Sequence, residues 1–152
     1  MNTYDKTSLY EMSYAFMRRF AFIRVSAPEI PSTDAELVAL MREYADVWEI
    51  ETNRQTLTTV GRVWRAMNHA VEGRAIGPAI VMDILAYVTE HPGTPLRDKI
   101  TRAVISYIFP QLEGVPGRRT IVQAIANVDG VSSDELDRTA REMLQTEPLD
   151  DG

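Results

Sequence analysis

The sequence contains no cysteine, which excludes disulfide frameworks, thiolate zinc sites and cysteine nucleophiles. Lysine is scarce too, because 14 of the 16 cationic residues are arginine and only Lys6 and Lys99 are lysine. Apolar runs such as residues 79–82 fall far short of the ~20 residues that a membrane span needs. The first residues include Asp5 and no apolar segment typical of a secretory signal, so we expect a cytoplasmic protein without membrane association.

Motifs of the common hydrolytic centres are also missing. The two histidines, His69 and His91, lie 22 positions apart and form no HExxH pattern. No G-x-S-x-G elbow, no GxxxxGK[ST] phosphate loop and no apolar strand ending in paired Mg²⁺-binding acids is found. We therefore expect no metal site and no hydrolysis by these residues alone.

The composition is that of one soluble globular domain. The chain has 152 residues, of which 45% are hydrophobic and 25% charged. Its 16 cations and 22 acids give a net charge of −6, which opposes sequence-independent attraction to nucleic acids or anionic membranes. We expect no direct binding to nucleic acid.

Beyond Pro31 the apolar spacing is helical. Thr33 and Glu36 form a predicted capping box before an amphipathic helix. Its apolar positions are Leu37, Leu40, Met41, Tyr44, Val47 and Trp48. The same reasoning predicts further helices over residues 57–71, 78–89, 96–112, 118–128 and 133–144.

Three local features refine this pattern. Pro110 is expected to kink or end the helix of residues 96–112 near Phe109, because proline lacks an N–H and clashes with the preceding turn. Ser132 and Glu135 suggest a second capping box. The tail from residue 147 onward is expected to fray.

The first 30 residues follow a different pattern. A short helix over residues 7–19 precedes a β-rich run at residues 20–25. A lone strand cannot satisfy its backbone groups, and the rest of the sequence supplies no obvious partner strand.

Residues 1–6 read MNTYDK, and residues 18–22 read RRFAF after the predicted short helix. This arrangement resembles the sensor 1 to arginine-finger stretch of AAA+ ATPases, most closely the branch of McrB-type motor subunits of methylcytosine-specific restriction systems. That branch reads MNTxDR, a helix, and then RRFAF with a strand. Lys6 departs from the usual arginine, and the helix is about one residue longer with Glu11, Met12 and Ser13 where a Leu-Asp pair is common.

The resemblance implies roles for five residues. Asn2 matches sensor 1, Arg18 or Arg19 the finger that acts on the neighbouring subunit, Arg74 sensor 2, and Asp5 a position near the subunit interface. It also makes residues 20–25 the fifth strand of a parallel sheet whose other strands lie in upstream sequence.

Each residue has a simpler interpretation. Asn2 can be an asparagine without a role, and Asp5 an N-cap. Arg18 and Arg19 can complement the macrodipole at a helix C-terminus, and Arg74 can be an ordinary loop arginine. The pair at residues 118 and 119 is expected to face solvent.

We therefore expect a mainly α protein: a short helix–strand remnant of an α/β AAA+ core at residues 1–30, a helical lid at 31–114 and a C-terminal helical extension at 115–152. By the resemblance it is the C-terminal part of a ring-forming motor that uses ATP or GTP with Mg²⁺ in the intact protein, with a nuclease or activator subunit as a further partner. The alternative is a stand-alone helical protein-interaction module without enzymatic activity.

Overall fold

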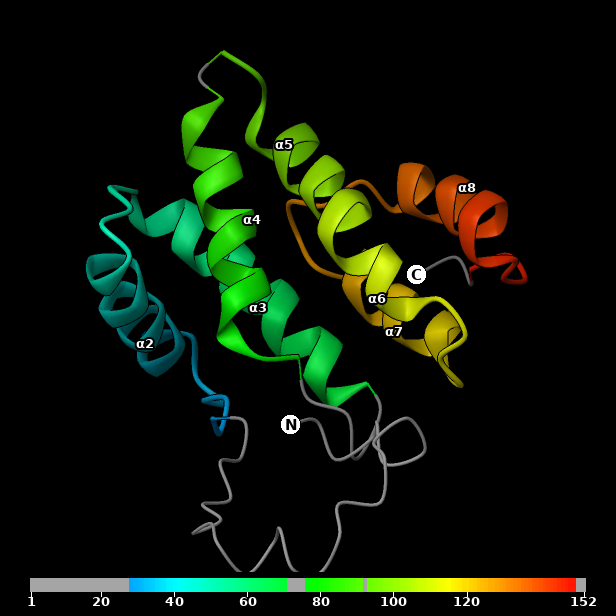
Figure 1. Ribbon diagram of the computed structural model, residues 1–152, viewed down its shortest axis with the longest axis horizontal. Helices are drawn as coiled ribbons and strands as arrows, with labels where there is room; N and C mark the ends of the chain where they lie inside the picture. Colours follow the sequence, from blue (N-terminus) through cyan, green and yellow to red (C-terminus); the bar gives the residue numbers. More distant parts are fainter. Residues whose placement is uncertain (1–27, 71–75, 92, 150–152) are drawn as a thin grey trace, which may run out of the picture.

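The computed structural model describes residues 28–70, 76–91 and 93–149, and every regular element in these ranges is a helix (Figure 1). The elements are α2 (Asp34–Val47), α3 (Arg54–His69), α4 (Pro78–Glu90), α5 (Leu96–Ala103), the π-helix η2 (Val104–Ile108), α6 (Phe109–Leu112), α7 (Arg118–Ala126) and α8 (Ser133–Leu144). The expectation of a mainly α protein is confirmed for these ranges. The predicted helix and strand before residue 28 lie outside them.

Local side-chain chemistry sets where the first helices begin. Thr33 caps α2 as predicted: its Oγ1 accepts a hydrogen bond from the Glu36 N–H at 3.4 Å and donates one to Glu36 Oε2 at 2.6 Å. Helix α3 begins three residues earlier than predicted, because Asn53 Oδ1 accepts from the Thr56 N–H at 2.9 Å and caps it.

Pro110 was expected either to kink the helix of residues 96–112 or to end it near Phe109. The helix does not end there. The chain continues from α5 through η2 into α6, and the Phe109 N–H donates to Val104 O five residues back. This wider turn places Pro110 in the first turn of α6, where a missing N–H is tolerated. The π-helix therefore carries the chain past the proline.

Helix α3 lies at the centre of the bundle and packs against α2, α4 and α7 (Figure 1). At Gly61 a Cβ atom would lie only 3.0 Å from Leu37 Cγ, so the glycine permits α2 to approach α3 closely. One hydrophobic cluster joins all these helices. Its largest fully buried side chains include Trp64, Phe109, Leu37, Met41, Leu57, Met82, Leu85, Ile100 and Ile125.

Helices α7 and α8 contribute to this same cluster. Ile121 and Ile125 of α7 and Leu136 of α8 are buried in it, and α7 packs on α3 while α8 packs on α6. The lid range and the C-terminal extension therefore share one core.

The predicted capping box at Ser132 is wrong in its chemistry. Ser132 is the N-cap of α8, but its hydroxyl makes no capping bond. Its backbone N–H instead donates to Thr101 Oγ1 at 2.9 Å, and that fully buried hydroxyl donates to Arg97 O at 2.8 Å. The start of α8 is thus fixed by a contact with α5.

Arg118 and Arg119 were expected to face solvent, but their guanidinium groups bind backbone carbonyls near the C-terminus. Arg118 Nε donates to Leu144 O at 2.8 Å, and Arg119 Nη2 donates to Pro148 O at 2.7 Å. The Leu149 N–H donates to Asp137 Oδ1 at 2.8 Å. The prediction of fraying is therefore wrong for Pro148 and Leu149, because Arg119 binds the Pro148 carbonyl and Asp137 binds the Leu149 N–H. Residues 150–152 lie outside the described ranges.

None of the helices in the described ranges meets the length and hydropathy that a membrane-spanning helix requires.

Candidate functional site

The five residues that the resemblance singles out all lie outside the described residues. Asn2, Asp5, Arg18 and Arg19 fall in residues 1–27, and Arg74 falls in residues 71–75. Their roles, and whether they come together, stay predictions. What the structure does describe is the two places where these segments join the helical bundle.

The first junction follows Arg74, where the chain returns to the bundle at Ile76. Trp64 Nε1–H donates to Ile76 O at 2.8 Å, and the Ile76 N–H donates to Asn68 Oδ1 at 2.6 Å. Asn68 is itself held, since its Nδ2 donates to Trp64 O at 2.9 Å. Two side chains of α3 thus bind both backbone polar groups of Ile76 and fix the point from which α4 starts.

Trp64 is well placed for this role. Its side chain is fully buried, and the Tyr44 ring packs against it edge-on with ring centroids 6.2 Å apart. A buried indole cannot change rotamer without displacing the core, so its N–H is a fixed donor. The position where the Arg74 segment re-enters the fold is therefore rigid.

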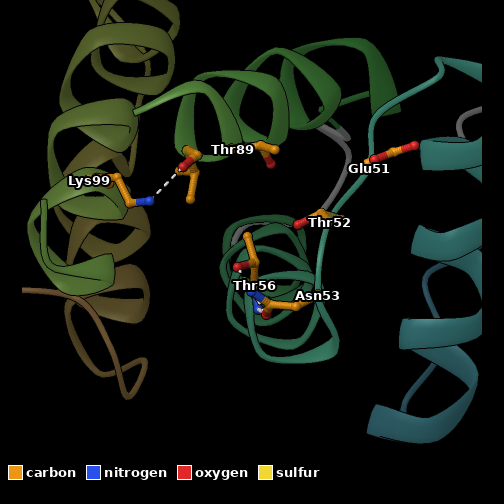
Figure 2. A pocket seen from close by; sticks show the side chains of 7 residues that line it. Glu51, Thr52, Asn53, Thr56, Thr89 and Lys99 are labelled. Carbon is orange, nitrogen blue, oxygen red and sulfur yellow. Dashed lines mark hydrogen bonds between the residues drawn. The ribbon is translucent and has the colours of Figure 1, made fainter. Parts of the chain in front are cut away.

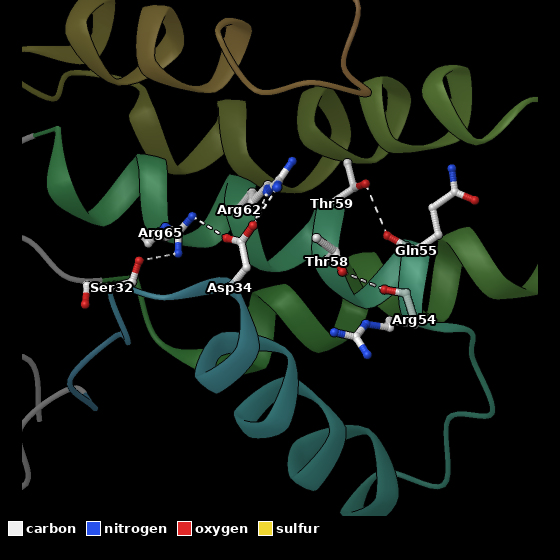
Figure 3. Close-up of polar contacts among 8 residues, drawn as sticks. All are labelled: Ser32, Asp34, Arg54, Gln55, Thr58, Thr59, Arg62 and Arg65. Carbon is white, nitrogen blue, oxygen red and sulfur yellow. Dashed lines mark hydrogen bonds and ion pairs between the residues drawn. The ribbon is translucent and has the colours of Figure 1, made fainter.

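The second junction is the start of α2, where the N-terminal segment enters the bundle. Asp34 lies between two arginines of α3: Arg62 Nε donates to Asp34 Oδ2 at 3.0 Å, and Arg65 Nη2 donates to Oδ1 at 2.7 Å (Figure 3). Arg65 Nη1 also donates to Ser32 O at 2.8 Å. Helix α3 thus holds residues 32–34 by side-chain contacts.

The charges at this junction stabilise one another. Hydrogen bonds from Arg62, and then from Arg65, lower the pKa of Asp34 to about 2. The hydrogen bond with Asp34 in turn raises the pKa of Arg62. The Arg62 and Asp34 side chains are 38% and 39% exposed, so water and salt screen the pair.

Sequence reasoning did not find this junction. Asp34 lies in the first turn of α2, where an acid is expected for the helix macrodipole alone. The available signal was the spacing of Arg62 and Arg65, which places both cations on one face of a predicted helix.

A separate hollow of about 430 Å³ lies where the start of α3 faces the end of α4 and the start of α5 (Figure 2). Its polar groups are committed to the fold: Lys99 Nζ donates to Val88 O at 2.7 Å, and the Thr89 hydroxyl donates to Leu85 O at 2.9 Å. Asn53, also in the wall, caps α3. The remaining charged group of the wall is the exposed carboxylate of Glu51, which stands without a second catalytic group beside it among the lining residues.

The two histidines occupy ordinary positions. His91 Nδ1 lies 2.7 Å from Tyr87 O, and its ring packs on the Tyr87 ring at a centroid distance of 4.2 Å. His69 is exposed in the last turn of α3. Among the described residues no cluster of three or more histidine, aspartate or glutamate side chains could hold a metal ion.

No protein family, curated protein or solved structure matches this chain.

Proposed function

We propose that this chain forms the C-terminal part of an AAA+ motor subunit similar to the McrB-type restriction ATPases. The observation that carries the proposal is the order of its parts. The MNTYDK and RRFAF motifs come first, and a bundle of helices follows. Helix α4 starts at Pro78, shortly after Arg74, where the resemblance places sensor 2.

The residues have distinct roles in this proposal. The amide of Asn2 donates to a γ-phosphate oxygen and orients the attacking water. Arg18 or Arg19 enters the neighbouring subunit's site, where the planar guanidinium stabilises charge on the transferring phosphoryl group. Arg74 contacts the nucleotide bound by its own subunit, and Asp5 lies near the subunit interface.

The fixed return at Ile76 supports the role of Arg74. A sensor on a lid works only if the movement of the lid moves the sensor. Because Trp64 and Asn68 hold Ile76 to α3, the residue at which the chain returns after Arg74 moves with the bundle as one body. The cluster of Asp34, Arg62 and Arg65 does the same for the point where the N-terminal segment enters.

ATP or GTP with Mg²⁺ is the cofactor of the proposed motor. Of the residues named here, Asn2 and Arg74 would contact its phosphates. The described residues contain no cluster suited to Mg²⁺, and the sequence has no phosphate loop. We therefore assign these two functions to another part of the motor.

Mixed rings test the proposal. In a motor assembled with this chain, replacing the true finger, Arg18→Ala or Arg19→Ala, should lower kcat by roughly 10³-fold or more and leave nucleotide binding by the isolated subunit nearly intact. Mixing finger-deficient subunits with subunits lacking a working phosphate loop should partly restore hydrolysis. Arg74→Ala should weaken binding or turnover in its own subunit.

Arg102→Ala is the matched control, because Arg102 is an exposed cation on α5. If neither Arg18→Ala nor Arg19→Ala lowers turnover by even tenfold, these residues are plain helix-end cations and the proposal fails. In that case the alternative, a helical protein-interaction module, explains the chain better.

A further inference from the structure

Several arginines line one side of α3. A hollow of about 690 Å³ lies between α3, the start of α5 and the loop before α8. Its wall includes Arg54, Thr58, Arg62, Leu96, Arg97 and Asp129. A second hollow, of about 330 Å³, adjoins it along α3, since both share Arg62 and Asp129. Its wall adds Arg65 and His69. We call the two together the α3 furrow.

The cations of the furrow exceed its acids. Asp34 is shared by Arg62 and Arg65, so one carboxylate faces two guanidinium groups. The Arg54 guanidinium makes no hydrogen bond or ion pair with the other residues drawn in Figure 3. Arg97 donates through its Nε to Val131 O at 3.2 Å. Asp129 is the one carboxylate among the lining residues of the two hollows, and it interacts electrostatically with Arg62. On a chain with a net charge of −6, this furrow has the opposite sign to the molecule.

The furrow is a fixed part of the fold. Gly130 has φ +96°, and a Cβ at this residue would lie 3.0 Å from Thr59 Cγ2, so the loop rests directly on α3. The hydrogen bond from Arg97 to Val131 O holds the same loop to α5. The guanidinium groups are therefore displayed on rigid elements.

The length of the furrow and its lining residues indicate which class of ligand it fits. Arg54 and His69 are 15 residues apart on one helix, which spans about 22 Å at 1.5 Å per residue. This length suits an extended polyanion better than a single ion. The described walls contain no phenylalanine, tyrosine or tryptophan on which a nucleic acid base could stack, and their one aromatic ring is the His69 imidazole. Leu96 and the methyl groups of Thr58 and Thr59 offer apolar contacts that suit peptide side chains.

We propose that the α3 furrow binds an acidic peptide segment of a protein partner, whose carboxylates pair with Arg54 and Arg97 on either side of the Asp34-bound Arg62. A guanidinium fork matches a carboxylate with two parallel hydrogen bonds. Apolar parts of such a segment pack on Leu96 and the threonine methyl groups. This binding needs no nucleotide and is independent of the proposed motor function.

Binding of a fluorescein-labelled oligoglutamate peptide, followed by fluorescence anisotropy, tests the inference. The wild-type chain should bind this peptide at low salt and lose affinity as salt is added. Arg54→Glu should weaken binding roughly tenfold or more, since about 1.4 kcal/mol is a factor of ten. This variant should fold, because an acid in the first turn of α3 suits the helix macrodipole. Arg54→Gln provides a second, neutral variant with a smaller expected loss.

The matched control is Arg102→Glu, which makes the same charge change on an exposed face of α5 outside the furrow. It should leave affinity within about twofold. Equal losses in Arg54→Glu and Arg102→Glu, or no binding at low salt, would overturn the inference. Tighter binding of a DNA duplex than of the peptide would assign the furrow to nucleic acid. Self-association that Arg54→Glu abolishes would assign it to a second copy of the chain.

Discussion

At the scale of single residues, Trp64 combines a fully buried side chain with a hydrogen bond to the backbone of Ile76. Trp64→Phe would keep most of the buried ring but remove the donor to Ile76 O, which then retains only the longer 3.4 Å contact from Asn68 Nδ2. We expect a loss of about 1 kcal/mol in unfolding free energy, measured by urea denaturation.

Trp48→Phe is the control for this change, because Trp48 is 48% exposed and should lose little. Equal unfolding free energies for the two variants would show that the bond to Ile76 contributes nothing to stability.

Asp34 connects stability to pH. Its pKa in the folded chain, about 2, lies below the ordinary value of 3.8, so folding favours the charged carboxylate. The resulting stabilisation is complete above pH 3.8 and is lost as the pH falls towards 2. The wild type should therefore be more stable than Asp34→Asn at neutral pH, and the difference should shrink over this acidic range.

Thermal unfolding at a series of pH values measures this difference. A gap between the wild type and Asp34→Asn that stays constant down to pH 2 would contradict the assignment.

Local pairs could be predicted from the sequence, and distant pairs could not. Thr33 and Glu36 are three residues apart, so their capping contact follows from helix geometry. Ser132 looks equally suited to cap α8, yet its N–H bonds to Thr101 on another helix. Asp34 likewise finds its partners only because α2 and α3 pack together.

At the scale of helices, the contact between α2 and α3 depends on Gly61. Gly61→Val should destabilise the chain by about 1–3 kcal/mol, because even a Cβ atom would lie 3.0 Å from Leu37 Cγ and 3.3 Å from Met41 Cγ. Gly61→Ala should cost less, since the gain in helix propensity of about 1 kcal/mol offsets part of the crowding.

Gly77→Ala is the matched control for denaturant unfolding, because a Cβ at Gly77 would meet nothing within 4 Å. If Gly61→Val proves as stable as Gly77→Ala, α2 and α3 are not closely packed at this point.

Apolar periodicity predicted the helices well because it reflects which faces are buried. Helix α8 has the predicted bounds, and α4 differs only at its last residue. The periodicity gave no sign of η2, because the shift to a five-residue step is a backbone adjustment ahead of Pro110 that leaves the apolar spacing helical.

At the scale of the whole molecule, the chain alone should not turn over nucleotide. It has no GxxxxGK[ST] loop, and its described residues form no cluster suited to a metal ion. Phosphate release from ATP or GTP with Mg²⁺ should therefore stay at background. Hydrolysis that Arg19→Ala abolishes and Arg102→Ala leaves intact would contradict this expectation.

The helices could be predicted from apolar periodicity, but the candidate site residues could not. Burial and periodicity carry no information about Asn2, Arg18 or Arg74, whose roles come from the resemblance alone. The α3 furrow shows the converse, because its cations come from α3 and α5, which the sequence separates by about 30 residues. Only the packed helices bring them to one surface.

The contrast between the two tryptophans gives the chain a built-in spectroscopic reporter. Trp64 is fully buried and bonded to the return point at Ile76, whereas Trp48 is 48% exposed at the end of α2. Acrylamide should quench the fluorescence of Trp48 and spare the blue-shifted emission of Trp64. Any ligand or partner that breaks the hydrogen bond between Trp64 and Ile76 would then become visible, without a label, as a red shift of the protected emission.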